Sequence, residues 1–461
     1  MVAIDAVRNV CYWVVQRFFP KEQMSAPELI KSSMNPLDRA IARARGRLVP
    51  FLLLMYVLGF LNRTNIGFAK DALRASAHIS NAAYALGAGL FFLSYAAFEI
   101  PSNLMMHRIG ARIWMTRIMV TWGLVSAAMI FANGEWSFYA LRLLLGAAEA
   151  GFFPGVILYL TYWFPNRSRT AMIGLFYFGA PLSFIFGSPL SGYLMQIPEV
   201  AGLHGWQWMF LIEGLMTVAV GIWTFWFLDD RPSDAAWLPA EEKTALSASV
   251  AQEDQSRTRH GPVAFSAALG NLRVLCFTII YFLIQMSIYG VIFYLPTQVA
   301  ALLGVKVNLE VGLVTAIPWI CALAATFVIP RIAQRTGRHR AIAAVTLGIS
   351  GIGIAVSASS TPLIAIMALC FAAAGFIAVQ PLFWAFPTSY LGGAAAAGGI
   401  ALINALGSLG GFLAPNVKAW ADTALGSPHA GLYVLAATTL VGSFLILVFL
   451  RPVPASVAPA A

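Results

Sequence analysis

The polar stretch "DDRPSDAAWLPAEEKTALSASVAQEDQSRTRHGP", residues 229–262, divides the chain into two apolar regions of similar length. A membrane-spanning helix needs about 20 consecutive, mostly apolar residues. Six segments of this kind precede the polar stretch and six follow it. The sequence therefore predicts an all-α membrane protein with 12 transmembrane helices in two six-helix bundles. The predicted spans are 48–68, 84–106, 113–132, 138–160, 170–195, 206–228, 273–300, 309–330, 341–358, 361–386, 390–417 and 430–450.

The composition of the whole chain also favours a lipid environment. Of its 461 residues, 59% are hydrophobic and 10% are charged, whereas a soluble domain is about 45–50% apolar and about 25% charged. The net charge of +10 is compatible with a nucleic-acid partner. The basic residues, however, are spread between the apolar segments instead of forming one patch, so we expect contact with the lipid bilayer and no nucleic acid.

Several kinds of chemistry have no support in the sequence. The four cysteines are scattered and show no Cys-x-x-Cys or Cys/His spacing, so we expect no disulfide, no metal and no cofactor. No phosphate-binding GxxxxGK[ST] motif occurs, and neither HExxH nor GxSxG is present. The chain is therefore not expected to be an enzyme.

The positions of Lys and Arg predict the orientation in the membrane. If the N-terminus is cytoplasmic, the outer loops hold only Lys70, Arg74, Lys306 and Lys418, and the cytoplasmic side holds most of the remaining basic residues. We therefore expect a multi-pass protein of the cell inner membrane with both termini cytoplasmic. The predicted organisation is a cytoplasmic N-terminal segment (1–47), an N-terminal bundle (48–228), a cytoplasmic linker (229–272), a C-terminal bundle (273–450) and a cytoplasmic tail (451–461).

Two short basic stretches occupy corresponding places in the two halves. "HRIGARIW" (107–114) follows the second span and "RIAQRTGRHR" (331–340) follows the eighth. The orientation rule alone can place glycine and arginine in such loops. Because the two stretches also share the same position in each half, we favour a duplicated transporter. Before the first span, "NPLDRAIARARGRLVP" (35–50) is typical of a short amphipathic helix at the inner membrane surface.

The stretch "LRLLLGAAEAGFFPGV" (141–156) places two charges, Arg142 and Glu149, inside a predicted span. A charge at mid-bilayer costs at least about 2.5–3.5 kcal/mol, so it persists when it faces a cavity, has a partner or has a function. The two residues lie two helical turns, about 10.5 Å, apart on one helix face. We expect them to line one strip of a cavity, where Arg142 holds or tunes an anion and Glu149 carries a proton. The alternative is a structural ion pair with another helix.

Two further charged positions lie near the ends of spans. Arg63 in "FLNRTNIGFAK" is flanked by Asn62 and Asn65, which could orient it toward an anion, although an arginine there could also extend to the outer interface. Glu99 in "FEIPSNLMMHR" is expected to act in gating. Its expected partners in the inner loop are Arg108 and Arg112. Glu213, near the outer end of the sixth span, is expected to be structural.

Four motifs resemble the major facilitator superfamily and, within it, the anion:cation symporter family of sugar-acid, tartrate and phthalate-type permeases. They are "NRTNIGFA", "EIPSNLMMHRIGAR", "RLLLGAAEAGFFPG" and "FWAFPTSYLGGAAAAGGIALINALGSLGGF". The resemblance covers nearly all of 48–450. It implies two bundles that rock around one central site and take up an organic anion together with protons.

The resemblance also implies roles for individual residues. It gives Glu149 the coupling proton and implies that substrate contacts come from several spans. The implied substrate-binding residues are Arg63, Tyr95, Arg142, Gln285, Tyr289, Trp384 and Asn404. Packing within a bundle is an equally good explanation for each of Gln285, Tyr289 and Trp384. One position departs from the family, because many members have an acidic residue where this chain has Asn62. The missing acid leaves the number of coupled protons open and favours a more negatively charged substrate.

Together these features predict a secondary transporter that imports a small organic anion by proton symport. Sugar acids, dicarboxylates and aromatic carboxylates all fit, and no partner chain is needed. An organic anion exchanger is the nearest alternative. A non-transporting membrane sensor is an alternative of another class, but the linker and the C-terminal tail are short for a signalling domain.

Overall fold

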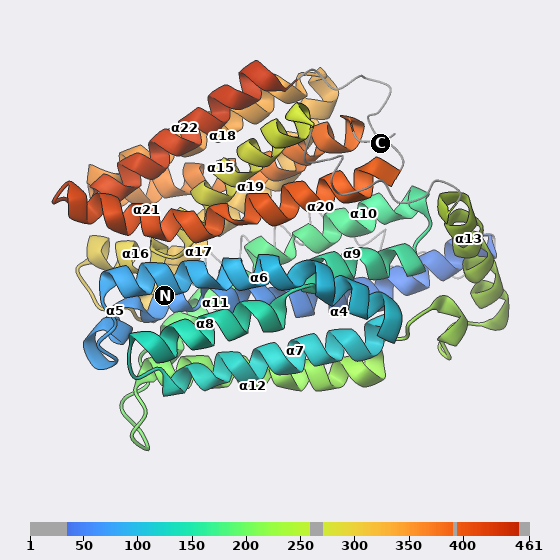
Figure 1. The fold of residues 1–461 in the computed structure, drawn as a ribbon, viewed down its shortest axis with the longest axis horizontal. Coiled ribbons are helices and arrows are strands. Elements are labelled where there is room, and N and C mark those ends of the chain that lie inside the picture. Colours follow the sequence, from blue (N-terminus) through green and yellow to red (C-terminus); the bar gives the residue numbers. More distant parts are fainter. Residues whose placement is uncertain (1–34, 259–270, 391–393, 451–461) are drawn as a thin grey trace.

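The computed structural model describes residues 35–258, 271–390 and 394–450. In these residues the chain is almost entirely helical, and the only extended pairing is an isolated bridge between Val200 and Leu203. Figure 1 shows the long helices running side by side. The first part of the chain forms α4 (Pro36–Thr64), α5 (Ile66–Ser76), α6 (Asn81–Ile109), α7 (Ala111–Ala127), α8 (Glu135–Glu149), α9 (Phe152–Trp163), α10 (Asn166–Tyr177), α11 (Gly179–Leu194), α12 (Gly205–Phe227) and α13 (Ala240–Thr258). The second part forms α15 (Leu272–Ile292), α16 (Leu295–Leu303), α17 (Leu309–Thr336), α18 (His339–Ser359), α19 (Pro362–Tyr390), α20 (Ala394–Ser408), α21 (Gly410–Ala424) and α22 (Ala430–Phe449).

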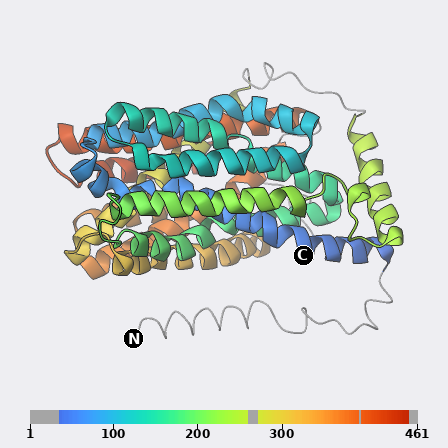
Figure 2. The ribbon, with the colours of Figure 1, turned by 90° about the horizontal axis from the view of Figure 1, so that it is seen from below.

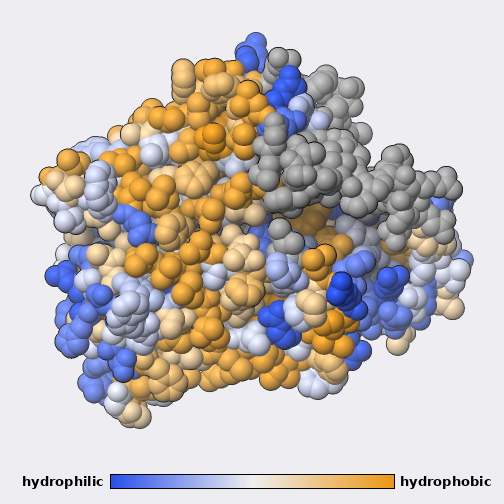
Figure 3. Space-filling model, viewed as in Figure 1, coloured by the Kyte–Doolittle hydropathy of each residue, from blue (hydrophilic) through white to orange (hydrophobic). Residues whose placement is uncertain are grey.

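The predicted membrane-spanning fold is confirmed. Eleven helical segments of the described chain are long and apolar enough to cross a membrane. In the remaining predicted span, 390–417, the described residues from Ala394 onward belong to α20 and α21, which meet at Leu409. Figure 3 shows a broad apolar surface between two hydrophilic ends, as expected for helices that pack against lipid.

Several spans are interrupted where the sequence pattern suggested one continuous helix. Between α8 and α9, Gly151 has a φ of +86°, a left-handed conformation that favours glycine. A Cβ at this position would lie 2.3 Å from the Ser102 hydroxyl of α6, so the backbone of the break also needs glycine for close packing. The break places the carboxyl group of Glu149 at the C-terminal end of α8. Interrupted helices in transporters commonly border a binding site.

The helices form two groups, one from each half of the chain, as Figure 1 shows. Contacts between the groups include α6 with α21 and α11 with α17. Glycine permits these contacts, because a Cβ on Gly192 of α11 would lie 2.4 Å from the carbonyl oxygen of Asn308. The end of the molecule that carries α13 is the α13 end, and the other end is the opposite end.

The first helix differs from the sequence-based prediction. Residues 36–47 are the first turns of α4, which continues through Pro50 to Thr64, and they form no separate surface helix. Asn35 caps the helix by accepting a hydrogen bond from the Leu37 amide at 3.2 Å, and Pro36 occupies the first helical position. Figure 2 shows these first turns reaching the same end of the molecule as α13.

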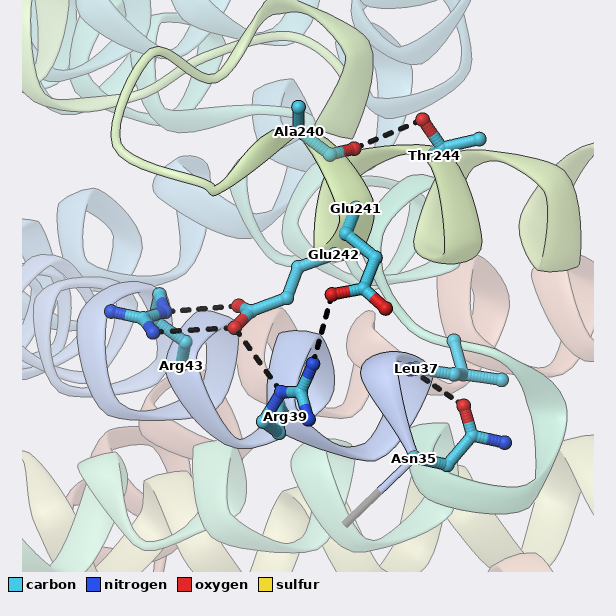
Figure 4. A network of polar contacts seen from close by, with 8 residues as sticks. All are labelled: Asn35, Leu37, Arg39, Arg43, Ala240, Glu241, Glu242 and Thr244. Atoms are coloured by element: carbon cyan, nitrogen blue, oxygen red, sulfur yellow. Dashed lines mark hydrogen bonds and ion pairs between the residues drawn. The ribbon is translucent and has the colours of Figure 1, made fainter. Parts of the chain in front are cut away.

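An ion-pair network fixes α13 to the start of α4 (Figure 4). The carboxylate of Glu242 accepts hydrogen bonds from Arg43 at 3.0 and 3.3 Å, and the Arg39 Nε lies 3.7 Å from it. Arg39 also donates to Glu241 at 3.1 Å. The two acids differ in exposure, because 5% of the Glu242 side chain and 69% of the Glu241 side chain are accessible. Glu242 is therefore the main anchor of α13.

Replacing Glu242 with Gln is expected to weaken the docking of α13 by about 1–2 kcal/mol, because it removes a charge-assisted contact that is only partly shielded from water. The matched change Glu241→Gln is expected to cost less than about 0.5 kcal/mol, since exposed ion pairs contribute little. Hydrogen–deuterium exchange of the α13 amides measures both effects. Equal exchange rates in the two variants would show that Glu242 is not the anchor.

Candidate transport site

A cavity of about 1440 Å³ lies between the two groups of helices. Its lining includes Arg331, Gln334 and Gly337, which are exposed at the α13 end, so the cavity is accessible from that end. Its deep part is lined by Arg63, Glu149 and other side chains from both halves. These other deep residues include Tyr56, Tyr95, Glu99, Tyr177, Tyr281, Gln285, Tyr289, Gln380, Trp384 and Asn404.

At the opposite end the two halves are in contact. The Tyr84 hydroxyl of α6 donates to the Phe293 carbonyl oxygen at 2.9 Å. The rings of Phe184 and Trp319 stack with centroids 3.8 Å apart. These contacts join α6 and α11 to the second half, so the described structure is open at the α13 end and closed at the opposite end.

The deepest charged group of the cavity is the ion pair of Arg63 and Glu149. Arg63 Nη2 donates to Glu149 Oε1, and Arg63 Nη1 donates to the hydroxyl of Tyr289 at 3.0 Å. The guanidinium carbon of Arg63 also lies 5.1 Å from the ring centroid of Tyr95, within the range of a cation–π contact. Because Tyr289 belongs to α15, Arg63 connects α4 and α8 with the other half of the protein.

This ion pair is incompletely satisfied. Arg63 Nε and Glu149 Oε2 are buried and have no hydrogen-bond partner in the described part of the chain. An unmade hydrogen bond at a buried charged group is costly. A carboxylate in the cavity could accept from the unused Arg63 donor in the planar geometry that guanidinium groups favour. The arrangement is therefore suited to binding an anion in competition with Glu149.

The remaining predicted contacts lie in the same cavity. Tyr95 projects from α6, Gln285 and Tyr289 from α15, Trp384 from α19 and Asn404 from α20, and all five line the cavity. Asn404 Nδ2 donates to Glu99 Oε1 at 2.9 Å, which gives a second polar contact between the halves. The structure thus brings together every predicted substrate-binding residue except Arg142.

Arg142 is buried away from the cavity, contrary to the prediction. Its Nε and Nη2 donate to the carbonyl oxygens of Gly87 and Ala88 on α6, at 3.1 and 3.3 Å. Its guanidinium lies 5.1 Å from the ring centroid of Phe91, a ring that Arg63 contacts at the same distance. The helical spacing correctly put Arg142 on one strip with Glu149, but at the depth of Arg142 the neighbouring α6 fills that strip. Arg142 therefore holds α8 against α6.

Replacing Arg142 with Gln is expected to lower the free energy of unfolding by about 2–3 kcal/mol, because it removes charge-assisted hydrogen bonds in a buried contact. The affinity for the anion is expected to change by less than about threefold, since the guanidinium does not reach the cavity. Thermal unfolding and equilibrium binding measure the two quantities. A large loss of affinity for the anion without loss of stability would show that Arg142 contributes to anion binding.

The asparagines beside Arg63 do not orient it. Asn62 Nδ2 donates to the Thr217 hydroxyl at 2.6 Å, and Asn62 Oδ1 accepts from Ser126 at 2.6 Å. Asn65 Nδ2 donates to Glu213 at 2.9 Å. Both asparagines thus face α12 or α7, so the residue type at position 62 acts on helix packing and not directly on the charge in the cavity. The Glu213 carboxylate also accepts from Ser191 at 2.7 Å, which fits its predicted structural role.

The expected gating contact of Glu99 is not formed in this structure. Glu99 faces the cavity and bonds Asn404, whereas Arg108 is exposed. The Arg112 amide donates to Asp230 at 2.8 Å, and the Arg112 side chain donates to the Phe225 carbonyl oxygen. Glu99 does not pair with these arginines because it lies more than two turns before the end of α6, too far from the loop for its side chain to reach.

Sequence reasoning missed several aromatic and polar residues of the cavity. Tyr281 precedes Gln285 and Tyr289 at intervals of four residues, so all three lie on one face of α15. This spacing was visible in the sequence and could have identified Tyr281. Tyr56, Tyr177 and Gln380 had no such signal, because their exposure to the cavity depends on where α4, α10 and α19 meet the other helices.

Membrane-crossing helices in two groups, with a water-accessible cavity between them and a charge pair at its closed end, define a membrane transport protein. Comparisons with known proteins agree. A family model described as Major Facilitator Superfamily matches residues 52–415, and this chain belongs to that superfamily of transporters.

Two of its relatives each cover about nine tenths of its length. The inner membrane transport protein RhmT of Escherichia coli is 50% identical over 410 residues, which are 89% of this chain and 95% of that protein. A protein of Agrobacterium vitis named as a tartrate transporter is 41% identical, with coverage of 92% and 94%. The inward open structure of the xylose transporter XylE from E. coli has a TM-score of 0.71 over 88% of this chain and 96% of that chain, at 13% identity. The comparison with XylE shows a shared fold.

Proposed function

We propose that this protein is a secondary active transporter that imports a small organic anion together with protons. The observation that carries the proposal is the buried pair of Arg63 and Glu149 at the closed end of the cavity. A permanent cation beside an acid that can be protonated is a site at which an anion and a proton can bind together. The other cavity residues, Tyr95, Gln285, Tyr289, Trp384 and Asn404, would then contact the remainder of the substrate.

Charge balance explains the coupling. In the empty site Arg63 and Glu149 neutralise each other. An anion that bound Arg63 beside an ionised Glu149 would leave one uncompensated negative charge in a buried site, which is costly. A proton on Glu149 removes that charge and releases the Arg63 donors. The pair of Arg63 and Glu149 is therefore close to charge balance in two forms, either without anion and proton or with both bound, and these are the forms of the pair that favour movement of the bundles.

Alternating access then requires the cavity to open at each end in turn. In the orientation predicted from Lys and Arg, the α13 end is cytoplasmic, and the described structure is the inward-facing state. The bodies that rock would be the bundles at 48–228 and 273–450, with 229–272 as the cytoplasmic linker. Location in the inner membrane is supported by the name of the relative in E. coli.

The cavity fits a carboxylate with polar or aromatic character. Tyrosine hydroxyls, amides and the Trp384 ring line the cavity around Arg63, which is its one buried cation among the described residues. Hydroxyl and amide groups suit a hydroxylated acid, and the name of the relative in Agrobacterium vitis supports the same class. Sugar acids, dicarboxylates and aromatic carboxylates are therefore the first substrates to test.

Uptake by proteoliposomes tests this function. The purified protein is reconstituted, and labelled L-tartrate, D-gluconate and benzoate are offered at acidic external pH with neutral internal pH. Symport is expected to concentrate at least one of them inside empty vesicles above the level that protein-free vesicles reach, and a proton ionophore is expected to abolish the accumulation. Uptake that occurs only when the vesicles contain an unlabelled anion would instead show an exchanger.

A further inference from the structure

The Glu99 carboxyl group bridges the two halves inside the cavity and forms no ion pair with another described residue. It projects from α6, is 6% exposed and accepts from Asn404 of α20 through Oε1. Its second oxygen, Oε2, is buried and has no hydrogen-bond partner in the described part of the chain. A buried carboxylate with one oxygen unsatisfied is unstable, and a proton on that oxygen removes both the charge and most of the unmet hydrogen-bonding demand.

The groups around Glu99 do not supply a compensating cation. The titratable and charged groups near it are Tyr95 of α6, Arg63 of α4 and Tyr281 of α15, and Glu149 of α8 lines the same cavity. Its neighbour on α20 is the uncharged Asn404. Arg63 is already paired with Glu149. With both acids ionised, the three charged residues Arg63, Glu149 and Glu99 would carry a net negative charge and repel an anion.

From this arrangement we propose that Glu99 is a second proton-binding carboxyl of the transport site, and that an anion binds Arg63 strongly only when Glu99 is protonated. The inference rests on the proposed anion transport. Protonation of Glu99 leaves Oε1 available to Asn404, so the contact between the halves persists while the repulsive charge disappears. Since linkage is reciprocal, anion binding must in turn favour uptake of a proton at Glu99.

The proposal gives the protein a route to a second coupled proton although position 62 holds no acid. Asn62 faces Thr217 and Ser126, away from the cavity, whereas Glu99 faces the cavity directly. Proton binding at Glu99 is separate from that at Glu149, because Glu149 competes with the substrate for Arg63 and Glu99 acts through the charge of the site.

Proton uptake on anion binding tests the proposal. The detergent-solubilised full chain is titrated with L-tartrate, D-gluconate or benzoate at near-neutral pH, in buffers of different ionisation enthalpy, and the slope gives the protons bound per anion. Against the Glu149→Gln variant, the double variant Glu149→Gln/Glu99→Gln is expected to take up about one proton fewer per anion over the range in which Glu99 titrates. Glu213→Gln, a buried acid away from the cavity, is the matched control and is expected to equal the wild type.

A measurement without substrate provides the second arm. In a pH titration, the infrared spectrum of the wild type is expected to gain a protonated-carboxyl band as the pH falls below neutral, and the Glu99→Gln variant is expected to lack that band. Equal proton uptake in the single and double variants, or identical spectra of wild type and Glu99→Gln, would overturn the proposal. If Glu149→Gln takes up as many protons as the wild type, or if none of the three anions binds, the proposed function fails instead, and the infrared arm still decides the state of Glu99.

Discussion

Replacing Glu149 with Gln is expected to lower accumulation of the anion by a pH gradient about tenfold per pH unit while leaving binding and exchange in place. Gln imitates the protonated acid, so the Arg63 donors stay available to the substrate, but no proton can be released at this position. Each proton coupled to transport contributes about a tenfold concentration ratio per pH unit. With a second proton bound at Glu99, the Glu149→Gln variant should therefore lose about one factor of ten per pH unit, and the double variant Glu149→Gln/Glu99→Gln should reach no more than the external concentration.

Two assays of the same vesicles separate this effect from simple loss of function. Exchange of labelled for unlabelled anion across the membrane needs no net proton movement and is expected to persist in Glu149→Gln. Glu213→Gln is expected to accumulate the anion like the wild type, because that acid bonds Ser191 and Asn65 away from the cavity. Accumulation by the Glu149 variant equal to that of the wild type under a pH gradient alone would remove Glu149 from the coupling mechanism.

Replacing Arg63 with Gln is expected to weaken anion binding by at least about 25-fold. Loss of one partner of a buried charge pair typically costs about 2–5 kcal/mol, and each 1.4 kcal/mol corresponds to about a tenfold change in affinity. The Arg63→Lys variant keeps the charge but loses the planar fork, so its affinity is expected to lie between those of the wild type and the Gln variant. Titration calorimetry with the anion that the transport assay identifies measures all three.

The stability of the same variants provides the control. Arg63→Gln leaves Glu149 buried without its partner, so we expect a lower free energy of unfolding, and the double variant Arg63→Gln/Glu149→Gln is expected to recover part of it. Anion binding should remain weak in the double variant, because the cation is still absent. Wild-type affinity in Arg63→Gln would show that the substrate carboxylate binds elsewhere.

The fold followed from the sequence because the bilayer imposes a simple requirement. A segment of about 20 apolar residues has few alternatives to a membrane-crossing helix, so the twelve spans and the polar division at 229–262 could be predicted. The interruptions at Asn65 and Gly151 could not, because the hydropathy pattern continues across them. They depend on where α6 and the second half approach the backbone.

The positions of the charged residues could also be predicted from the sequence only in part. That Arg63 and Glu149 face the cavity was predictable, since unpaired intramembrane charges are rare and usually face an interior. Their pairing with each other was not predictable, because 86 residues separate them along the chain. Arg142 was misplaced for the complementary reason, since helical spacing gives the face of a helix but not the neighbour that covers it. Glu99 was assigned to the inner-loop network because the sequence does not show at what depth α6 contacts α20.

The role proposed for the ion pair of Arg63 and Glu149 depends on the conformation of the protein. With the opposite end closed by contacts such as Tyr84 to Phe293, an anion in this state can exchange only through the α13 end. Arg63 reaches Tyr289 across the two halves at the point where the cavity ends. A substrate that drew Arg63 away from Glu149 would therefore act directly on the contact that joins the halves, which is how binding energy can be linked to movement of the bundles.

The structure of the protein with a bound carboxylate is the most direct test of the central claim, which is that the substrate replaces Glu149 as the partner of Arg63. We expect the carboxylate of the anion to accept hydrogen bonds from the Arg63 guanidinium, with Glu149 withdrawn from it and the rest of the substrate against Gln285, Trp384 and Asn404. An anion bound elsewhere in the cavity, with the contact between Arg63 and Glu149 intact, would contradict the claim.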